Sequence, residues 1–230
     1  MNNGSERLAF IFDVDGVLVH SMPLHVLAWE EYLAGLGIKV DDLERRMHGK
    51  RNAELVNDLI ASDLTDDAVF RHGAAKEALW REMLLREGVH KYEVAGLIEF
   101  LERHRDVPKA VASNAEPQNI DFVLEHYGLR RFFTVAVNGF DVEHGKPAPD
   151  IYLKAARRLG VEPARCIVFE DSPTGLAAGL AAGMRVVGVK TTTDQLEGAA
   201  LLIDDFRDPK LEEWLEANVV RSAGQNSAVS

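Results

Sequence analysis

The sequence predicts an α/β fold: a doubly wound, Rossmann-like parallel sheet with a second, smaller all-helical domain inserted after the first strand. Two observations predict it. From about residue 94 onwards, short apolar segments alternate with helical segments, which is typical of a parallel sheet covered by helices. Before that point, residues 23–88 show one helical pattern after another and no convincing strand. We therefore expect a core domain of residues 1–19 and 89–230 and a helical domain of residues 20–88.

The first predicted strand ends in a pair of carboxylates. Residues 8–12 are apolar throughout, as in a strand buried on both faces. Asp13 and Asp15 follow at a spacing that places both on the same side of an extended chain. Gly16 then allows the chain to turn away sharply. Ligands of open α/β sheets bind outside the carboxyl ends of strands, but acidic turns use the same residue types, so this segment alone favours neither interpretation.

The helical domain begins at Ser21-Met22-Pro23, where a proline in the first turn favours helix initiation. Its first helix ends near Gly35. Further helices are expected at residues 41–47, 52–61 and 65–86 in this domain, and at 94–105, 118–127, 151–159 and 173–182 in the core. The remaining core strands are expected at residues 107–112, 133–137, 166–169, 186–189 and 201–203.

Composition excludes several classes of protein. The formal net charge of −11 argues against a surface that binds nucleic acid or an anionic membrane. No apolar stretch approaches the ~20 residues needed to span a bilayer, and the polar N-terminus does not fit a secretory signal. The single cysteine, Cys166, lies in an apolar segment and is interpreted as a buried strand residue. We expect a cytoplasmic protein, and a monomer because no long apolar surface stripe stands out.

Polar groups follow four of the predicted strands. They are Asp13 and Asp15, Ser113 and Asn114, Lys146 in the loop after residues 133–137, and Glu170 and Asp171. Clustered carboxylates suit Mg²⁺, which also binds substrate phosphate oxygens. A lysine and a hydroxyl neutralise and orient a phosphate. An ionised aspartate can attack phosphorus, and a second carboxylic acid can protonate the leaving alkoxide and then activate water.

Four motifs, taken in order, resemble those of the haloacid dehalogenase-like hydrolase superfamily. They are Phe12-Asp13-Val14-Asp15-Gly16-Val17, Ala112-Ser113-Asn114, Lys146-Pro147-Ala148-Pro149-Asp150 and Phe169-Glu170-Asp171-Ser172. The segment from Glu170 to Met184, together with the helical insert, is similar to the β-phosphoglucomutase-like phosphatase branch, in which the insert is a cap domain. The resemblance covers nearly the whole chain and implies a Rossmann-like core with a helical cap.

The resemblance also implies a role for each matched residue. Asp13 would be the nucleophile and Asp15 the general acid and base. Ser113 and Asn114 would hold the phosphoryl group, and Lys146 would pair with it.

The same resemblance implies a magnesium site. Its ligands would be Asp13, the carbonyl oxygen of Asp15, Asp171 and Glu170. Adjacent residues of an extended strand point to opposite sides, so Glu170 and Asp171 need a bend to share the ion. That one of them acts through a water molecule is left open.

Asp15 bears on the type of reaction. In the family's dehalogenases the second aspartate is absent, because no alkoxide leaving group needs a proton. We therefore expect a Mg²⁺-dependent phosphomonoester hydrolase that forms an aspartyl-phosphate and acts on a small phosphorylated metabolite, namely a sugar phosphate. A phosphosugar mutase of the β-phosphoglucomutase type is one alternative. A catalytically silent ligand-binding protein that retains the fold is another, although the intact motifs count against it.

Residues of the cap bear on the choice between hydrolase and mutase. In the mutases, a cap arginine and a lysine after the second motif grip the distal phosphate of a sugar bisphosphate. Aligned on Gly49, this sequence has Asn52 at the arginine position, and it has Glu116 at the lysine position. The loss of two positive charges and the gain of one negative charge should weaken the binding of a second phosphate. Lys50 and Arg51 lie nearby and could compensate, so the comparison favours a hydrolase without deciding.

Two further cap residues match substrate-contacting positions. His25 matches a histidine at the cap entrance of the mutases, and a histidine on a helix face near the domain hinge is an equal alternative. Lys76 resembles a cap lysine that reaches the substrate, but a solvated helical lysine is the favoured interpretation. Trp29, Trp80 and Met83 have helical spacing and are predicted to form the core of the cap.

Overall fold

A computed structural model describes residues 7–47 and 50–219 of the chain. Two compact units make up the structure: the described residues of 1–20 together with those of 93–230, called here the core unit, and the described residues of 21–92, called the cap unit. The domain boundaries expected from the sequence stay a prediction. Gly49, one of the predicted cap residues, lies outside the described residues.

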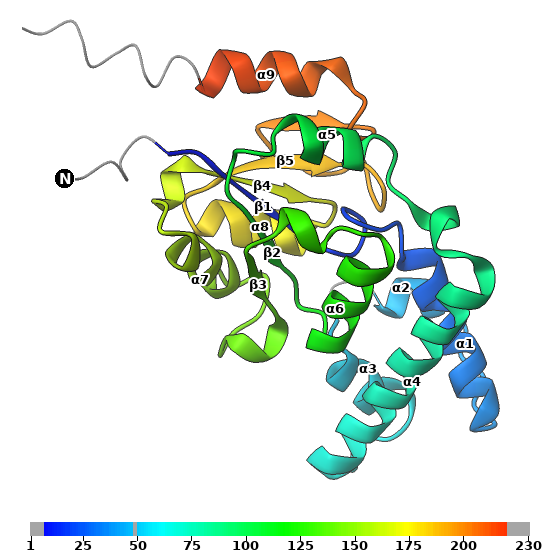
Figure 1. Cartoon of the computed structure of the whole chain (residues 1–230). Helices are drawn as coiled ribbons and strands as arrows, with labels where there is room; N and C mark the ends of the chain where they lie inside the picture. The colour runs from blue at the N-terminus through cyan, green and yellow to red at the C-terminus, as the bar shows by residue number, and fades with distance from the viewer. Residues whose placement is uncertain (1–6, 48–49, 220–230) are drawn as a thin grey trace, which may run out of the picture. The chain divides into compact units, whose positions relative to one another are not determined.

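The core unit is built on a parallel sheet (Figure 1). Its strands are β1 (Ala9–Phe12), β2 (Lys109–Ala112), β3 (Val135–Val137), β4 (Cys166–Glu170), β5 (Arg185–Val189) and β6 (Leu201–Ile203). In the described part of the chain these six strands are ordered β3-β2-β1-β4-β5-β6, and every neighbouring pair is parallel. This is the strand order of a doubly wound Rossmann-like sheet. The predicted fold class is confirmed.

Helices connect the strands of the core unit. They are α5 (Leu97–Arg103), α6 (Pro117–His126), α7 (Asp150–Leu159), α8 (Pro173–Ala181) and α9 (Pro209–Val219), with the single 3₁₀ turns η2 (Arg130–Phe132), η3 (Gly139–Asp141) and η4 (Pro163–Arg165). Prolines stand at the start of α6 and α8, where the missing N–H costs nothing because no intrahelical partner exists there.

The two faces of the sheet bury different side chains. Ala9 and Ile11 of β1 belong to a mainly aliphatic cluster that includes buried residues of α7 and α8. Phe10 and Phe12, which alternate with them, belong to an aromatic cluster on the α5 side. Phe10 stacks on Phe100 of α5 with ring centroids 5.6 Å apart, and Phe12 stacks on Phe169 of β4 at 4.6 Å. A strand buried on both faces needs such a continuous apolar run, as the sequence of β1 predicts.

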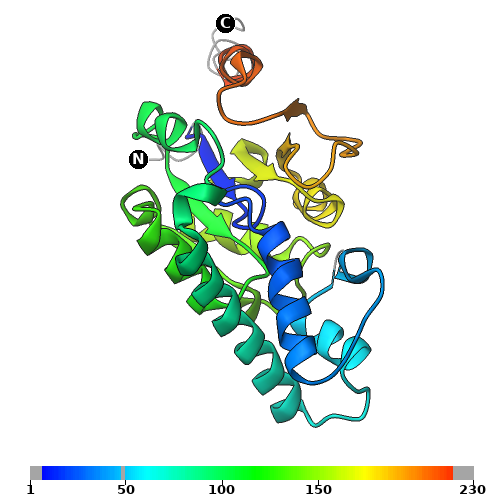
Figure 2. The same ribbon diagram turned by 90° about the vertical axis from the view of Figure 1, so that its right-hand side faces the viewer.

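The cap unit contains the helices α1 (Met22–Gly35), α2 (Leu43–Met47), α3 (Asn52–Leu59) and α4 (Asp66–Glu87), followed by the 3₁₀ turn η1 (Val89–Tyr92). Helices α1 and α4 lie side by side (Figure 2). Trp29, Trp80 and Met83 are buried, which confirms their prediction as core residues. Thr65 caps α4 by accepting a hydrogen bond from the Ala68 N–H, which agrees with the helix start predicted at this residue.

Two helices differ from expectation. The helix predicted from residue 94 begins only at Leu97, because Gly96 adopts a left-handed conformation with φ of 75°. The sequence analysis did not predict α9, and Leu211 and Leu215 of this helix are buried. Cys166 is buried in β4, as expected. Within the described residues, no helix has the length and apolar character needed to cross a membrane.

The aromatic cluster predicts a large difference between two phenylalanines of the core unit. Phe100 is fully buried in the cluster, whereas Phe140 is 65% exposed. We expect Phe100→Ala to lower the free energy of unfolding by about 3–5 kcal/mol, through lost burial and the cavity left behind. Urea denaturation would measure it, with Phe140→Ala as the matched control that stays close to the parent protein. Equal losses in the two variants would contradict the burial assigned to Phe100.

Candidate active site

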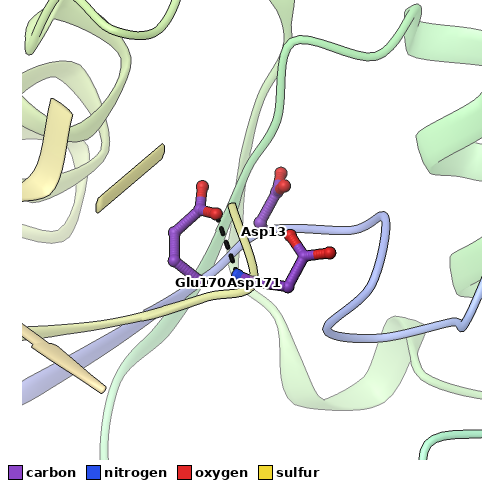
Figure 3. Close-up of side chains that lie close together, drawn as sticks. All are labelled: Asp13, Glu170 and Asp171. Carbon is purple, nitrogen blue, oxygen red and sulfur yellow. Dashed lines mark hydrogen bonds between the residues drawn. The ribbon is translucent and has the colours of Figure 1, made fainter. Parts of the chain in front are cut away.

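The polar residues predicted from the sequence gather at the carboxyl ends of the strands. Asp13 directly follows β1 and its N–H donates to the carbonyl of Phe169 in the neighbouring strand β4, at 3.1 Å. Glu170 is the last residue of β4, and Asp171 follows it. Between β1 and β4 the direction of winding reverses, and ligands of doubly wound sheets bind at this position. Figure 3 shows these three carboxylates close together.

Lys146 joins two of the carboxylates. Its Nζ lies 2.8 Å from Asp13 Oδ1 and 2.6 Å from Glu170 Oε1. All three side chains are buried, so this ammonium is not a solvated loop lysine. The hydroxyl of Tyr152 in α7 also donates to Glu170 Oε1, at 2.6 Å. Lys146 therefore brings the loop after β3 to the ends of β1 and β4.

The second carboxylate oxygen of Glu170 is held by the next turn of chain. Glu170 Oε2 accepts from the N–H groups of Asp171 and Ser172, at 3.0 and 3.2 Å, and from Ser172 Oγ, at 3.1 Å. The chain bends here, at the position where the sequence requires a bend if Glu170 and Asp171 are to share an ion. Ser172 Oγ also accepts from the Gly175 N–H and so caps α8.

The carboxylate cluster has the composition of a cation site. One oxygen from each of Asp13, Glu170 and Asp171 lies within 4.8 Å of the others. Asp13 Oδ1 is buried and accepts no well-directed hydrogen bond, and the Lys146 contact is one of distance alone. Hard divalent cations prefer such oxygen ligands. The residues present therefore fit a divalent cation.

Electrostatics point to the same conclusion. Burial raises the pKa of Asp13 to about 7; the Lys146 ammonium opposes the shift, and the carboxylates of Glu170 and Asp15 add to it. Burial, with Glu170 and Asp13 nearby, also raises the pKa of Asp171 well above its usual range. Like charges at this spacing repel each other. A bound cation would stabilise both ionised forms.

The remaining predicted core residues lie in the loops around this cluster. Ser113 follows β2, and its Oγ accepts from the Ala115 N–H at 3.2 Å. Asn114 Oδ1 accepts from the backbone N–H of Lys146 at 3.1 Å, which links the loops after β2 and β3. Asp15 is half-buried in a turn closed by a 2.7 Å hydrogen bond from the Gly16 N–H to the Val19 carbonyl.

Two glycines leave room for the carboxylates. A Cβ at Gly16 would lie 1.7 Å from Asp171 Oδ2, and the φ of +75° at this residue disfavours any side chain. A Cβ at Gly175 in α8 would lie 1.8 Å from Glu170 Oε1. Both glycines are needed because the backbone approaches a carboxylate closely.

The sequence analysis did not predict three side chains of the site. Tyr152 holds Glu170, Thr192 donates its hydroxyl to Asp171 Oδ2, and Thr191 donates to the carbonyl of Gly16 at 2.5 Å. A signal existed for the threonines, because Lys190-Thr191-Thr192-Thr193 follows the predicted strand that became β5. Tyr152 carries no such signal, since it lies inside an amphipathic helix.

In the cap unit, the expectation that Lys76 is solvated is wrong. Lys76 is 1% exposed, and its Nζ donates to Glu77 Oε1 at 2.5 Å and to His25 Nδ1 at 3.1 Å. Since an ammonium only donates, Nδ1 of His25 accepts. The His25 ring stacks on Trp80 at 4.6 Å, and Asn52 donates to Glu77 Oε1 at 2.7 Å. Glu77, which the sequence analysis did not single out, is the centre of this cluster.

The other predicted substrate-contacting residues are placed as follows. Lys50 pairs with Asp58 at 2.8 Å. Arg51 precedes α3, and its backbone N–H donates to Glu54 Oε2 at 2.8 Å. Glu116 is half-buried at the start of α6 in the core unit. Their roles toward a substrate, like those of His25, Gly49 and Lys76, stay predictions.

Comparison with known proteins identifies the family. Residues 8–183 match the model of the haloacid dehalogenase-like hydrolases. The chain belongs to the haloacid dehalogenase-like hydrolases. The resemblance inferred from the four motifs is thereby confirmed, as is the expectation that the protein is a hydrolase.

Individual relatives cover most of the chain. The fructose-1-phosphate phosphatase YqaB of Escherichia coli is 36% identical over 190 residues, which are 80% of this chain and 98% of the relative. A phosphorylated carbohydrates phosphatase of Thermotoga maritima is 34% identical over 200 residues, covering 84% of this chain and 89% of the relative. The crystal structure of a β-phosphoglucomutase from Clostridium difficile superposes with a TM-score of 0.80 at 24% identity, covering 94% of this chain and 99% of that one. At that identity, the structure supports the fold alone.

The close approach at Gly175 predicts that this haloacid dehalogenase-like hydrolase does not tolerate a methyl group there. In Gly175→Ala the added Cβ must displace Glu170, which holds Lys146 beside Asp13. Misplacement by about 1 Å lowers turnover on the order of 100-fold, and steady-state hydrolysis would measure it. Gly35→Ala, at the end of α1 with no atom within 4 Å of the new Cβ, is the control. Full activity in Gly175→Ala would show that Glu170 is not held as described.

The Lys76–Glu77 pair predicts a pH-dependent stability. Burial by itself would raise the pKa of Glu77, but the charge of Lys76 and the hydrogen bonds from Lys76 and Asn52 outweigh it and lower the pKa from 4.5 to about 2. Because the folded-state pKa is depressed, the stabilisation is complete above pH 4.5 and is lost as the pH falls toward 2. The resulting loss in the free energy of unfolding is on the order of 3 kcal/mol.

Urea denaturation between pH 7 and the acid limit of solubility would measure this loss. In Glu77→Gln we expect a lower free energy of unfolding at neutral pH and a shallower decline toward acid, because the amide does not titrate. Glu82→Gln, at an exposed position of the same helix, should keep the parent's slope. Identical slopes in the parent and Glu77→Gln would refute the assignment.

Proposed function

We propose that this protein hydrolyses small phosphomonoesters, phosphorylated sugars in particular, in a Mg²⁺-dependent reaction through an aspartyl-phosphate on Asp13. The observation that carries the proposal is the position of the Asp13 carboxylate. It is buried at the end of β1, 2.8 Å from the Lys146 ammonium and within 4.8 Å of oxygens of Glu170 and Asp171. The position thus combines three features. Asp13 can attack phosphorus, the Lys146 ammonium can pair with the phosphoryl oxygens, and the carboxylate cluster fits a divalent ion.

Two chemical steps follow from this arrangement. An oxygen of Asp13 attacks phosphorus, the ester P–O bond breaks, and Asp15 gives its proton to the leaving alkoxide. Asp15, now ionised, then takes a proton from a water molecule as that water attacks phosphorus. The bond between phosphorus and Asp13 breaks, and phosphate leaves. Lys146, Ser113 and the amide of Asn114 orient the phosphoryl oxygens through both steps.

We assign the ion to Asp13, Asp171 and the backbone carbonyl of Asp15. When bound, Mg²⁺ supplies positive charge that neutralises and orients the phosphoryl oxygens. Glu170 already accepts five hydrogen bonds, from Lys146, Tyr152, Asp171 and Ser172. We therefore propose that Glu170 positions Lys146 and acts on the ion through water.

Charges within the cap unit favour a monophosphate over a bisphosphate. A second phosphate would be recognised by cations, and the two cap lysines predicted to contact substrate already pair with carboxylates of the same unit. Lys76 pairs with the buried Glu77, and Lys50 pairs with Asp58. In the core unit, Glu116 carries a negative charge at the position where the mutases have a lysine. This pattern supports a hydrolase rather than a phosphosugar mutase, and the names of the YqaB and Thermotoga relatives support sugar phosphates as the substrate class.

The test is release of free phosphate from a panel of small phosphomonoesters, with Mg²⁺ and with a chelator. We expect Mg²⁺-dependent release that is abolished in Asp13→Asn, because an amide is a poor nucleophile. In Asp15→Ala, kcat should fall about 10²–10⁴-fold through loss of general acid–base catalysis. Asp121→Asn, at an exposed residue of α6, should retain full activity.

Two outcomes would contradict the proposal. Substantial turnover by Asp13→Asn, once deamidation is excluded by mass spectrometry, would rule out the covalent route. Conversion of a hexose 1-phosphate to its 6-phosphate upon addition of bisphosphate, without release of phosphate, would make the protein a mutase.

A further inference from the structure

A cavity lies at the amino ends of the strands, on the opposite edge of the sheet from Asp13. Its volume is about 500 Å³, within the ~300–1,000 Å³ range of small-molecule sites. Arg7 precedes β1, Lys109 begins β2 and Thr134 precedes β3, and all three line it. Lys109 and Ser113 stand at opposite ends of β2, about 13 Å apart at ~3.3 Å per residue. The cavity is therefore separate from the active site.

Positive charge is concentrated in this cavity although the chain carries a net charge of −11. Among the described residues, the cations that line it are Arg7, Arg105, Lys109, Arg131 and Arg158, and the one lining carboxylate is Asp106. Two carboxylates outside the lining take up part of the charge. Glu102 accepts from Arg105 and, at 3.0 Å, from Arg131, and Asp141 accepts from Arg158 at 2.9 Å. The cations still outnumber these carboxylates by five to three.

One of these cations, Lys109, is buried and is therefore not an ordinary solvated surface charge. It is 1% exposed, and its Nζ donates to the backbone carbonyls of His104 and, at 2.9 Å, Val107. Burial lowers the pKa of its ammonium, while Asp106 opposes the shift. A buried ammonium that faces an arginine-lined cavity would be stabilised by an anion placed there.

Most of the remaining lining is apolar. Val107, Pro108, Phe132 and Leu159 contribute carbon surface, and the Arg131 guanidinium lies over the Phe132 ring at 4.5 Å. Guanidinium groups bind phosphate oxygens with paired hydrogen bonds. Apolar walls beside them would accept the organic part of the same ligand.

We propose that this cavity, lined by Arg7, Arg105, Lys109, Arg131 and Arg158, is a second binding site that takes a small organic phosphate with an apolar or ring-shaped body. The site is independent of the proposed hydrolysis, because none of these residues belongs to the active site. A ligand that the protein does not hydrolyse therefore makes the best probe.

Calorimetric titration of the full chain with phenylphosphonate tests the proposal, since its carbon–phosphorus bond is not a phosphoester. A chelator in the buffer suppresses binding at the active site, where Asp13, Glu170 and Asp171 repel a dianion in the absence of a cation. We expect saturable binding, at least tenfold weaker in the double variant Arg131→Gln/Arg158→Gln. Inorganic phosphate should bind more weakly than phenylphosphonate, and equal affinity would overturn the assignment of an organic ligand.

The chain offers a matched control. Arg130 and Arg157 are the sequence neighbours of the two cavity arginines and are exposed outside the lining. Arg130→Gln/Arg157→Gln removes the same charge and should change the affinity less than threefold. Phosphoester hydrolysis retained by each variant reports that it is folded. If Arg131→Gln/Arg158→Gln does not fold, Arg7→Glu replaces it and should also weaken binding at least tenfold.

Absence of saturable binding by the parent protein would overturn the proposal. Equal weakening in the two double variants would overturn it as well, because the anion would then respond only to overall charge.

Discussion

The active site depends on one ammonium group held between two buried carboxylates. Lys146 comes from the loop after β3, Asp13 from the end of β1 and Glu170 from the end of β4, so this contact fixes three chain segments at once. Removing one partner of a buried pair leaves an uncompensated charge and typically costs about 3–5 kcal/mol. The hydrogen bonds of Tyr152 and Ser172 to Glu170 follow from the same constraint, since a buried carboxylate needs donors on every side.

The Lys146 ammonium does not neutralise the negative charge of the site. Asp13, Glu170 and Asp171 bring three carboxylates together against one Lys146. Burial, to which this excess of negative charge adds, raises the pKa of Asp13 and of Asp171. A site built for structural stability alone would pair its charges one to one. Here the excess is retained at the position where the winding of the sheet reverses, and a divalent cation bound there would relieve it. The unfavourable electrostatics and the proposed affinity for a cation would then have the same cause.

The sequence predicted those parts of the molecule that depend on local patterns. The apolar run before Asp13 and the polar residues after four strands are visible in single segments, and the parallel sheet then requires that they meet. Tyr152 and Thr192 were missed because their partners, Glu170 and Asp171, lie 18 and 21 residues away along the chain. The error at Lys76 has a similar origin. A lysine followed by a glutamate on a helix is ordinarily solvated, and the packing of α1 and α3 against α4 buries this pair.

The polarity of the fold accounts for part of the charge at the opposite edge of the sheet. Helices of a doubly wound sheet run against the strands, so their carboxyl ends, which attract cations, lie near the amino ends of the strands. Arg158 in the last turn of α7 has this explanation. Lys109 has this explanation too, because its Nζ donates to the carbonyl of His104, the C-cap residue of α5. Arg7, which precedes a strand, does not have it. Helix ends therefore account for part of the positive charge but not for Arg7, and the five cations of the lining outnumber the three carboxylates near them. An anion bound in the cavity would balance this excess of positive charge.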